Sequence, residues 1–189
     1  MLREWKSIRS ECIQHFRIFD LMRETYISPR TGDQYPFYVL QTMDWTNIIP
    51  VTSDGHVVMI RQFRAGIRSF TLEIPGGLVD PSDGSPLKAA RREMCEETGY
   101  DSEEIVSLGM AHPNPAFMNN RCYTFLARNV RCIGEQKLDI GEDIDVCLIP
   151  LEKIPQLIRD GEITHSLVLN AFQWFMDLQC QKTKQTPGE

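Results

Sequence analysis

The chain has 189 residues, 42% apolar and 24% charged, a composition that suits a soluble globular domain with a sizeable core. Its formal net charge of −6 argues against a surface that binds nucleic acid through phosphate contacts, so we expect no nucleic-acid partner. No apolar run is long enough to span a membrane, so we expect no membrane partner. The cysteines are scattered without a CxxC pair, which favours reduced thiols and a cytoplasmic location over disulfides or a zinc site.

The first part of the chain is expected to form strands. Residues 1–15 form either a short helix or a disordered arm. Residues 15–44 predict a β-hairpin or short meander, because strand formers flank a Ser-Pro-Arg-Thr-Gly-Asp turn at 28–33. Further strands are predicted at residues 45–50, 57–64, 71–75, 109–112, 122–130 and 145–150.

Helices are expected in the middle and at the end of the chain. The central helix follows Ser85, a suitable N-cap, and ends at Gly99, which can take the left-handed conformation. Two closing helices are predicted after Leu151 and over about 164–181, where apolar residues recur at helical spacing. Strands interrupted by a central helix and finished by helices predict a mixed sheet between helical layers.

The central helix carries a cluster of glutamates. Glu93 lies three residues from Glu96 and four from Glu97, spacings that place all three side chains on one helix surface. Like charges there repel, and a bound magnesium ion would offset the repulsion. A solvated acidic face balanced by Arg91 and Arg92 is the alternative. The glutamates alone do not decide between the two interpretations.

The order of features around this helix favours the metal site. A Gly-Gly turn, a polar loop, a capped helix, Arg-Glu, paired glutamates and a glycine follow one another, and this resembles the Nudix box, G-x5-E-x7-R-E-U-x-E-E-x-G-U, with U a bulky apolar residue. Residues 92–100 match the second half without a gap. The first half departs from the pattern. The position of its first glutamate falls on Asp83 when the spacing is counted forward from Gly77. It falls on Gly84 when the spacing is counted back from Arg92, so the loop carries one extra residue.

Outside the box, the resemblance narrows to the ADP-ribose and nucleoside diphosphate sugar pyrophosphatase branch. It implies an α/β fold, the Nudix-type α/β/α sandwich with a mixed sheet, preceded by a small N-terminal β-hairpin subdomain. The implied domains are the N-terminal segment with the β-hairpin subdomain at 1–44, the Nudix domain at 45–181 and a frayed tail at 182–189. The branch also implies a homodimer in which the N-terminal hairpin is exchanged. The matching stretches are Trp45, 62–64, 72–77, 113–117, 141–144 and 161–175.

The resemblance also implies metal ligands. Two or three Mg²⁺ or Mn²⁺ ions are expected, with Glu93 and Glu97 as direct ligands and Glu96 as ligand to a further ion. The Gly76 carbonyl adds an oxygen in the branch. Arg92 would hold a box glutamate by a charge-assisted hydrogen bond and orient it. The alternative for Arg92 is a surface salt bridge of negligible energy.

A general base is expected in a mobile loop well after the box. Glu142 is the first choice, and Asp139 and Asp143 are its rivals. The branch often carries a second acid two residues earlier, where this chain has Ile140. The alternative is that the Glu142 carboxylate only caps the following strand.

Five residues are candidates for substrate binding. Arg64 would grip a phosphate or the terminal sugar, Glu73 would accept hydrogen bonds from sugar or base, and Trp45 would stack on the base. A buried sheet position is an equally good interpretation of Trp45. Pro115 stands where the branch carries a proline, and Arg121 is either a second phosphate contact or a charge at a strand edge.

The leading hypothesis is a magnesium-dependent pyrophosphatase that cuts a nucleoside diphosphate sugar, with ADP-ribose giving AMP and ribose 5-phosphate. The close alternative is another sugar nucleotide such as GDP-mannose. A hypothesis from another class is a non-catalytic nucleotide-sensing regulator. Such a protein would normally show a degraded glutamate cluster, which this chain lacks.

Overall fold

The structure is a computed structural model that describes residues 2–185, with side chains described through residue 181. The chain divides into two compact units. The first unit comprises residues 1–44 together with 112–121, and the second comprises residues 45–111 and 122–189.

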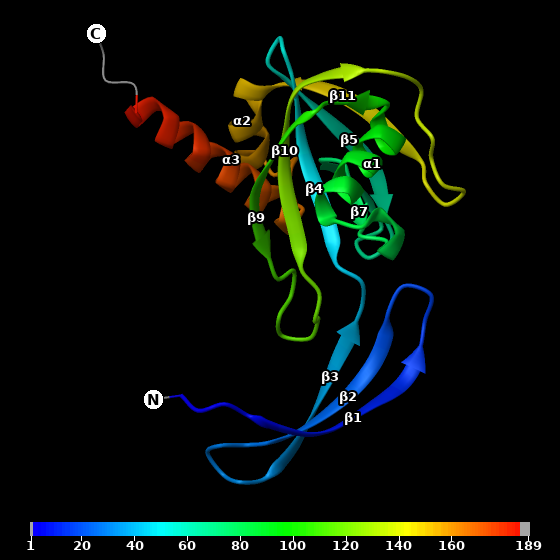
Figure 1. Cartoon of the computed structure of the whole chain (residues 1–189), viewed down its shortest axis with the longest axis vertical. Helices are drawn as coiled ribbons and strands as arrows, with labels where there is room; N and C mark the ends of the chain where they lie inside the picture. Colours follow the sequence, from blue (N-terminus) through cyan, green and yellow to red (C-terminus); the bar gives the residue numbers. More distant parts are fainter. Residues whose placement is uncertain (1, 186–189) are drawn as a thin grey trace. The chain divides into compact units, whose positions relative to one another are not determined.

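The first unit is built on an antiparallel sheet of three strands in the order β1-β2-β3 (Figure 1). The expected turn at 28–33 joins β2 to β3, with Gly32 at a φ of 81° that favours glycine. Segment 112–121 joins this unit through a parallel bridge between Leu40 and Met118. The strands are β1 (Lys6–His15), β2 (Asp20–Ile27) and β3 (Gln34–Gln41).

The expectation of a short helix or a disordered arm at the N-terminus is wrong over Lys6–His15, which forms β1. This strand pairs with β2 from end to end. Register shifts between Ser7 and Arg9 and between Cys12 and Gln14 interrupt the pairing. Each shift breaks the alternation of side chains that identifies a strand in sequence, so the pattern does not predict β1.

The second unit contains a sheet of eight strands, and its mixed character confirms the prediction. Strands β7 and β8, of three and two residues, are not among the predicted strands. Strands β11-β5-β4-β10-β8 lie in that order, with β6 paired to β5, β7 to β4 and β9 to β10. Strands β4 and β10 run parallel, and the other pairs are antiparallel. The strands are β4 (Trp45–Thr52), β5 (His56–Arg64), β6 (Ser69–Glu73), β7 (Gly76–Leu78), β8 (Tyr100–Asp101), β9 (Glu104–Ala111), β10 (Cys122–Cys132) and β11 (Ile144–Pro150).

Helices cover both faces of this sheet, which gives the expected α/β/α sandwich (Figure 1). Neighbouring residues of β4 point to opposite faces: Ile48 packs with Met94 of α1, and Ile49 packs with Phe172 of α3. The helices are α1 (Pro86–Thr98), α2 (Ile154–Arg159) and α3 (Ser166–Gln185), with short 3-10 turns at Pro81–Asp83 and Leu151–Lys153.

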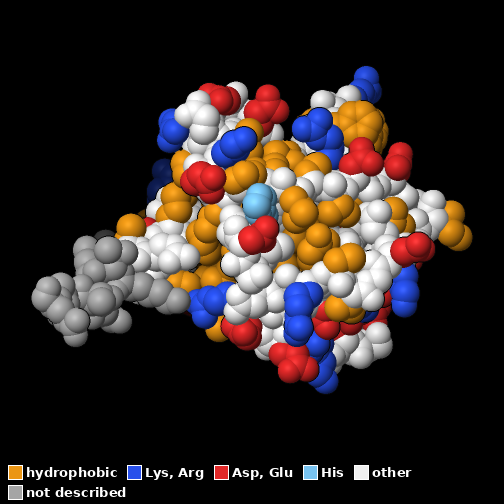
Figure 2. Space-filling view, turned by 90° about the horizontal axis from the view of Figure 1, so that it is seen from above, with side chains coloured by type: hydrophobic (Ala, Val, Ile, Leu, Met, Phe, Trp, Pro, Cys, Tyr) orange, Lys and Arg blue, Asp and Glu red, His pale blue; other side chains and the backbone are white. Residues whose placement is uncertain are grey.

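Helix α3 is longer than expected: its backbone continues through residues 182–185, which the sequence predicts to be part of a frayed tail. Residues 186–189 lie outside the described residues. Within the described part of the chain, no helix combines the length and apolar character needed to cross a bilayer. On the face drawn in Figure 2, the described acidic and basic side chains are interspersed among apolar ones and do not form a single basic patch.

Candidate active site

Helix α1 is positioned by signals local to the sequence. Ser85 Oγ accepts a hydrogen bond from the Lys88 amide at 3.3 Å, and Pro86 occupies the first helical turn. Gly99 ends the helix at φ 73°, and its amide donates to the Cys95 carbonyl at 2.9 Å. The predicted caps are therefore confirmed, and they fix which residues of α1 face the sheet.

Glu97 is the buried carboxylate of the site, with 2% of its surface exposed. Its Oε2 accepts a hydrogen bond from the Gly76 amide of β7 at 2.8 Å. Burial, together with the negative charges of Glu93 and Glu142, raises the pKa of Glu97 to about 8, against the opposing effect of the Gly76 amide. The protein alone therefore provides too little positive charge to keep this carboxylate ionised at neutral pH.

The two glycines of β7 leave no room for side chains. A Cβ on Gly76 would lie 2.3 Å from the backbone oxygen of Thr46 on the paired strand β4. A Cβ on Gly77 would lie 2.3 Å from Glu93 Oε1, so only a glycine here lets the Glu93 carboxylate lie against β7. Burial also raises the pKa of Glu93, although Arg92 opposes that effect. The Gly-Gly pair thus brings strand and glutamates close together.

Arg92 joins the box glutamates to the preceding loop. Its Nε and Nη2 donate to the two oxygens of Asp83 at 2.7 and 3.0 Å. Its Nη1 donates to Glu93 Oε1 and to Glu96 Oε2, both at 2.9 Å. Asp83 therefore fills the acidic slot counted forward from the glycines, and the extra residue follows it as Gly84, at φ 73°. The box spacing counted forward from Gly77 therefore predicts the position of this acid. The same spacing counted back from Arg92 falls on Gly84 instead.

Arg64 and Glu73 form an ion pair across strands β5 and β6. Arg64 Nε and Nη2 each lie 2.7 Å from one oxygen of Glu73, whose side chain is almost fully buried. Burial raises the pKa of Glu73, but hydrogen bonds from Arg64 and Thr71 outweigh that effect and leave the pKa below its ordinary value. The hydrogen bonds to Glu73 raise the pKa of Arg64, and the charges of Glu97 and Glu142 raise it further, so the pair lies within electrostatic range of these carboxylates.

Glu142 lies in the loop before β11, which begins at Ile144. Its Oε2 accepts a hydrogen bond from the Asp139 amide at 2.9 Å, and its own amide donates to the Asp139 carbonyl at 2.9 Å. Its negative charge contributes to the raised pKa values of Glu93 and Glu97. Glu142 therefore acts electrostatically on the box, and all three candidate bases are exposed.

The remaining predicted residues are divided between the two units. Trp45 is the half-buried first residue of β4, paired with Leu78 of β7 and Cys122 of β10. Pro115 and Arg121 are exposed and belong to segment 112–121 of the first unit. The second unit by itself thus brings together the glutamates, Arg92, Gly76, Arg64, Glu73 and Glu142.

The donor atoms of the box fit a hard divalent cation. Glu93, Glu96 and Glu97 offer only carboxylate oxygens, which Mg²⁺ prefers. Burial, and to a smaller extent neighbouring carboxylates, raise the pKa values of Glu93 and Glu97, and a bound cation would oppose both effects. Another group of possible ligands lies in the first unit, where donor atoms of Cys12, His15 and Asp20 lie within 4.8 Å of one another.

Fold and site together define a metal-dependent hydrolase of phosphate compounds, because Mg²⁺ is typically held by a few carboxylates together with substrate phosphates. The chain belongs to the Nudix family of hydrolases, since the NUDIX domain model matches residues 44–172. Members of this family hydrolyse nucleoside diphosphate compounds with a divalent metal.

Relatives match almost the whole chain. The ADP-ribose pyrophosphatase of Bacillus subtilis (strain 168) is 27% identical over 183 residues, which cover 95% of this chain and 98% of that protein. The methanol dehydrogenase activator of Bacillus methanolicus is 26% identical over 184 residues, 97% of this chain and 98% of the relative. A crystal structure of an ADP compounds hydrolase superposes with a TM-score of 0.83 at 21% identity and covers 98% of each chain. The last likeness concerns the fold alone.

Proposed function

We propose that this protein hydrolyses the pyrophosphate bond of a nucleoside diphosphate sugar, with ADP-ribose as the substrate that yields AMP and ribose 5-phosphate. The observation that carries the proposal is the cluster of Glu93, Glu96 and Glu97 on α1, in which the buried Glu97 carboxylate is bonded to the Gly76 amide of the Gly-Gly strand. The full-length similarity to a protein named ADP-ribose pyrophosphatase supports the choice of sugar nucleotide.

In this proposal Glu93, Glu96 and Glu97 bind two or three Mg²⁺ or Mn²⁺ ions, and the Gly76 carbonyl supplies a further oxygen. When bound, the ions neutralise the pyrophosphate oxygens and lower the pKa of a bound water. Arg92 keeps Glu93 and Glu96 in place by hydrogen bonds of 2.9 Å to each. Asp83 keeps Arg92 in place in turn.

Glu142 is the proposed general base. It takes the proton of the attacking water while the water oxygen bonds to one phosphorus, and the bridging P–O bond breaks to release the second phosphate. The Glu142 carboxylate must leave the Asp139 amide to do so. Asp139 and Asp143 remain its rivals for this role.

Five residues are proposed to contact the substrate. Arg64 grips a phosphate or the terminal sugar, and Glu73 holds Arg64 ready, since the Glu73 oxygens accept hydrogen bonds from Arg64 and Thr71. A sugar hydroxyl or a base N–H group that donates to Glu73 has to compete with Arg64 and Thr71. Trp45 stacks on the base. Pro115 and Arg121 are proposed as further substrate contacts on the resemblance alone.

We further propose a homodimer formed through the first unit. Its sheet exposes aromatic and aliphatic side chains that a monomer leaves in water, including Tyr35, Tyr38 and Ile8. The rings of Trp5 and Tyr26 pack edge to face on Phe37 of β3. The molecular mass in solution, measured by light scattering, tests this part.

The function is tested by incubating the pure protein with a panel of nucleotides, with and without Mg²⁺, and identifying the products. The panel contains ADP-ribose, ADP-glucose, GDP-mannose, UDP-glucose, a dinucleoside polyphosphate and a nucleoside triphosphate. We expect Mg²⁺-dependent release of AMP from ADP-ribose, abolished by Glu97→Gln and retained by Glu103→Gln at an exposed position. If GDP-mannose were the only compound cut, with release of GMP, the proposed reaction would stand and GDP-mannose would replace ADP-ribose as the proposed substrate.

One observation favours a second function. The relative named methanol dehydrogenase activator matches nearly all of this chain, and its name describes action on another enzyme. The second candidate is therefore a regulator that binds a nucleotide without cutting it. Nucleotide binding by calorimetry, combined with no product from any compound of the panel, would favour the regulator.

A further inference from the structure

The end of α1 is tied to the loop formed by residues 133–143, which connects β10 to β11. The last carbonyls of a helix have no partner within the helix and must be satisfied elsewhere. The Lys137 amide donates to the Glu96 carbonyl and the Ile133 amide donates to the Gly99 carbonyl, both at 2.8 Å. This loop therefore caps the helix that carries the glutamates.

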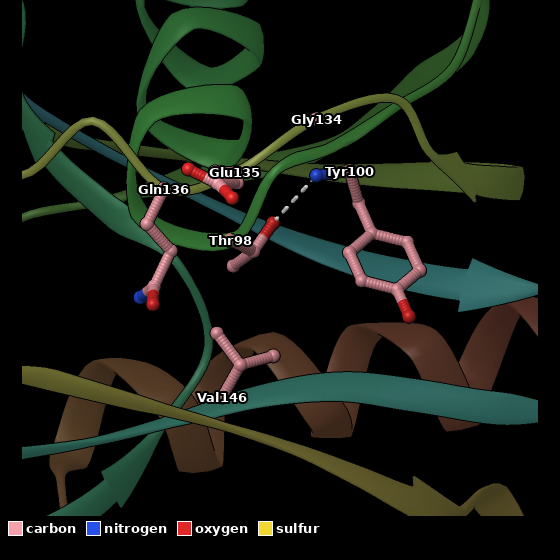
Figure 3. A pocket seen from close by; sticks show the side chains of 6 residues that line it. All are labelled: Thr98, Tyr100, Gly134, Glu135, Gln136 and Val146. Atoms are coloured by element: carbon pink, nitrogen blue, oxygen red, sulfur yellow. Dashed lines mark hydrogen bonds between the residues drawn. The ribbon is translucent and has the colours of Figure 1, made fainter.

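Among the residues that the structure describes, Gln136 makes the side-chain hydrogen bond between this loop and the end of α1. Its Nε2 donates to the Glu97 carbonyl at 2.6 Å and to the Ile144 carbonyl, at the start of β11, at 3.0 Å. An amide nitrogen has two protons to give, and both partners here accept only, so the orientation of the amide follows from its partners. Figure 3 shows the side chain extending from the loop past Thr98 toward the strand that carries Val146.

The close approach of loop and helix also depends on Gly99. A Cβ at this position would lie 2.2 Å from the Gly134 carbonyl oxygen. The glycine that closes the box therefore serves both the left-handed helix end and the docking of the loop. The docked loop carries Glu142, whose amide and carboxylate bond to Asp139 a few residues beyond Gln136.

We infer that Gln136 is a positioning residue for catalysis: it locks the loop that carries Glu142 onto the backbone of Glu97, and so fixes the base relative to the metal-binding helix. The Gln136 side chain bonds both to the backbone of Glu97 and to the backbone of Ile144, where β11 begins just after Glu142. This inference rests on the proposed function for its catalytic consequence. The anchoring of the loop does not depend on it.

The anchor is tested without turnover by hydrogen exchange in the whole protein. Gln136→Met keeps the length of the side chain and removes both donors. We expect faster exchange of the amides of residues 137–142, by about tenfold, with α3 unchanged. Gln173→Met makes the same chemical change at an exposed position of α3, where the Gln173 amide donates to Asp177, and should leave the loop unchanged. Unchanged loop exchange in Gln136→Met would overturn the inference.

The catalytic consequence is tested by steady-state kinetics on the nucleotide that the wild type cuts. Gln136→Met should lower kcat about tenfold and leave KM within about twofold, because a displaced base slows chemistry without changing substrate contacts. In a Glu142→Gln background the same substitution should cause no further loss. A loss of equal size in both backgrounds, or an unchanged kcat, would refute the positioning role. A wild type that cuts no nucleotide contradicts the proposed function, and hydrogen exchange then decides the anchor alone.

Discussion

Replacing Glu97 with Gln should stabilise the metal-free protein while abolishing its activity. The ordinary pKa of 4.5 is raised to about 8 in the folded state. Between these values the unfolded chain is ionised and the folded one is protonated, so stability from this group is complete below pH 4.5 and is lost as pH rises to 8. At about pH 7 the difference amounts to roughly 3 kcal/mol, from about 1.4 kcal/mol per pKa unit. Glutamine keeps an oxygen for the Gly76 amide and avoids this cost.

The assay is urea unfolding of wild type and Glu97→Gln in a chelator, at pH 7 and at pH 4.5. We expect the variant to be more stable by up to about 3 kcal/mol at the higher pH, with the difference falling below about 0.5 kcal/mol at the lower pH. Added Mg²⁺ should stabilise the wild type and not the variant. Glu103→Gln is the control for an exposed carboxylate. A variant that is less stable than the wild type at pH 7, or a difference independent of pH, would refute the buried-charge reasoning.

Three other substitutions test the site. Gly76→Ala places a Cβ 2.3 Å from the Thr46 backbone oxygen and should lower the free energy of unfolding, by about 3 kcal/mol in urea unfolding. Asp83→Asn removes the charge that holds Arg92 and should weaken that clamp by about 1.4 kcal/mol, seen as roughly tenfold slower turnover; wild-type turnover would exclude it. Glu142→Gln should lower kcat by about a hundredfold or more with little change in KM, and a smaller effect than that of Asp139→Asn would move the base to the rival.

The sequence by itself determined the elements whose signals are local. Ser85 and Gly99 set the ends of α1 by hydrogen bonds within one turn, and the helical period then placed Glu93, Glu96 and Glu97 on one surface. The turn at 28–33 likewise depends on neighbouring residues. The order of strands and helices predicted a sheet between helical layers, and the structure places Ile48 and Ile49 of β4 on its two faces.

Only the tertiary structure decided the features that join distant residues. Strand β1 exists because β2 pairs with it, and its bulges hide it from any period in the sequence. Asp83 became the partner of Arg92 because the loop folds back onto α1. Nothing in the sequence marks Gln136, since a glutamine gains its role only when two carbonyls from a helix end and a strand start meet beside it. Likewise, the pKa of Glu97 depends on burial and on charges brought near by folding, neither of which sequence spacing specifies.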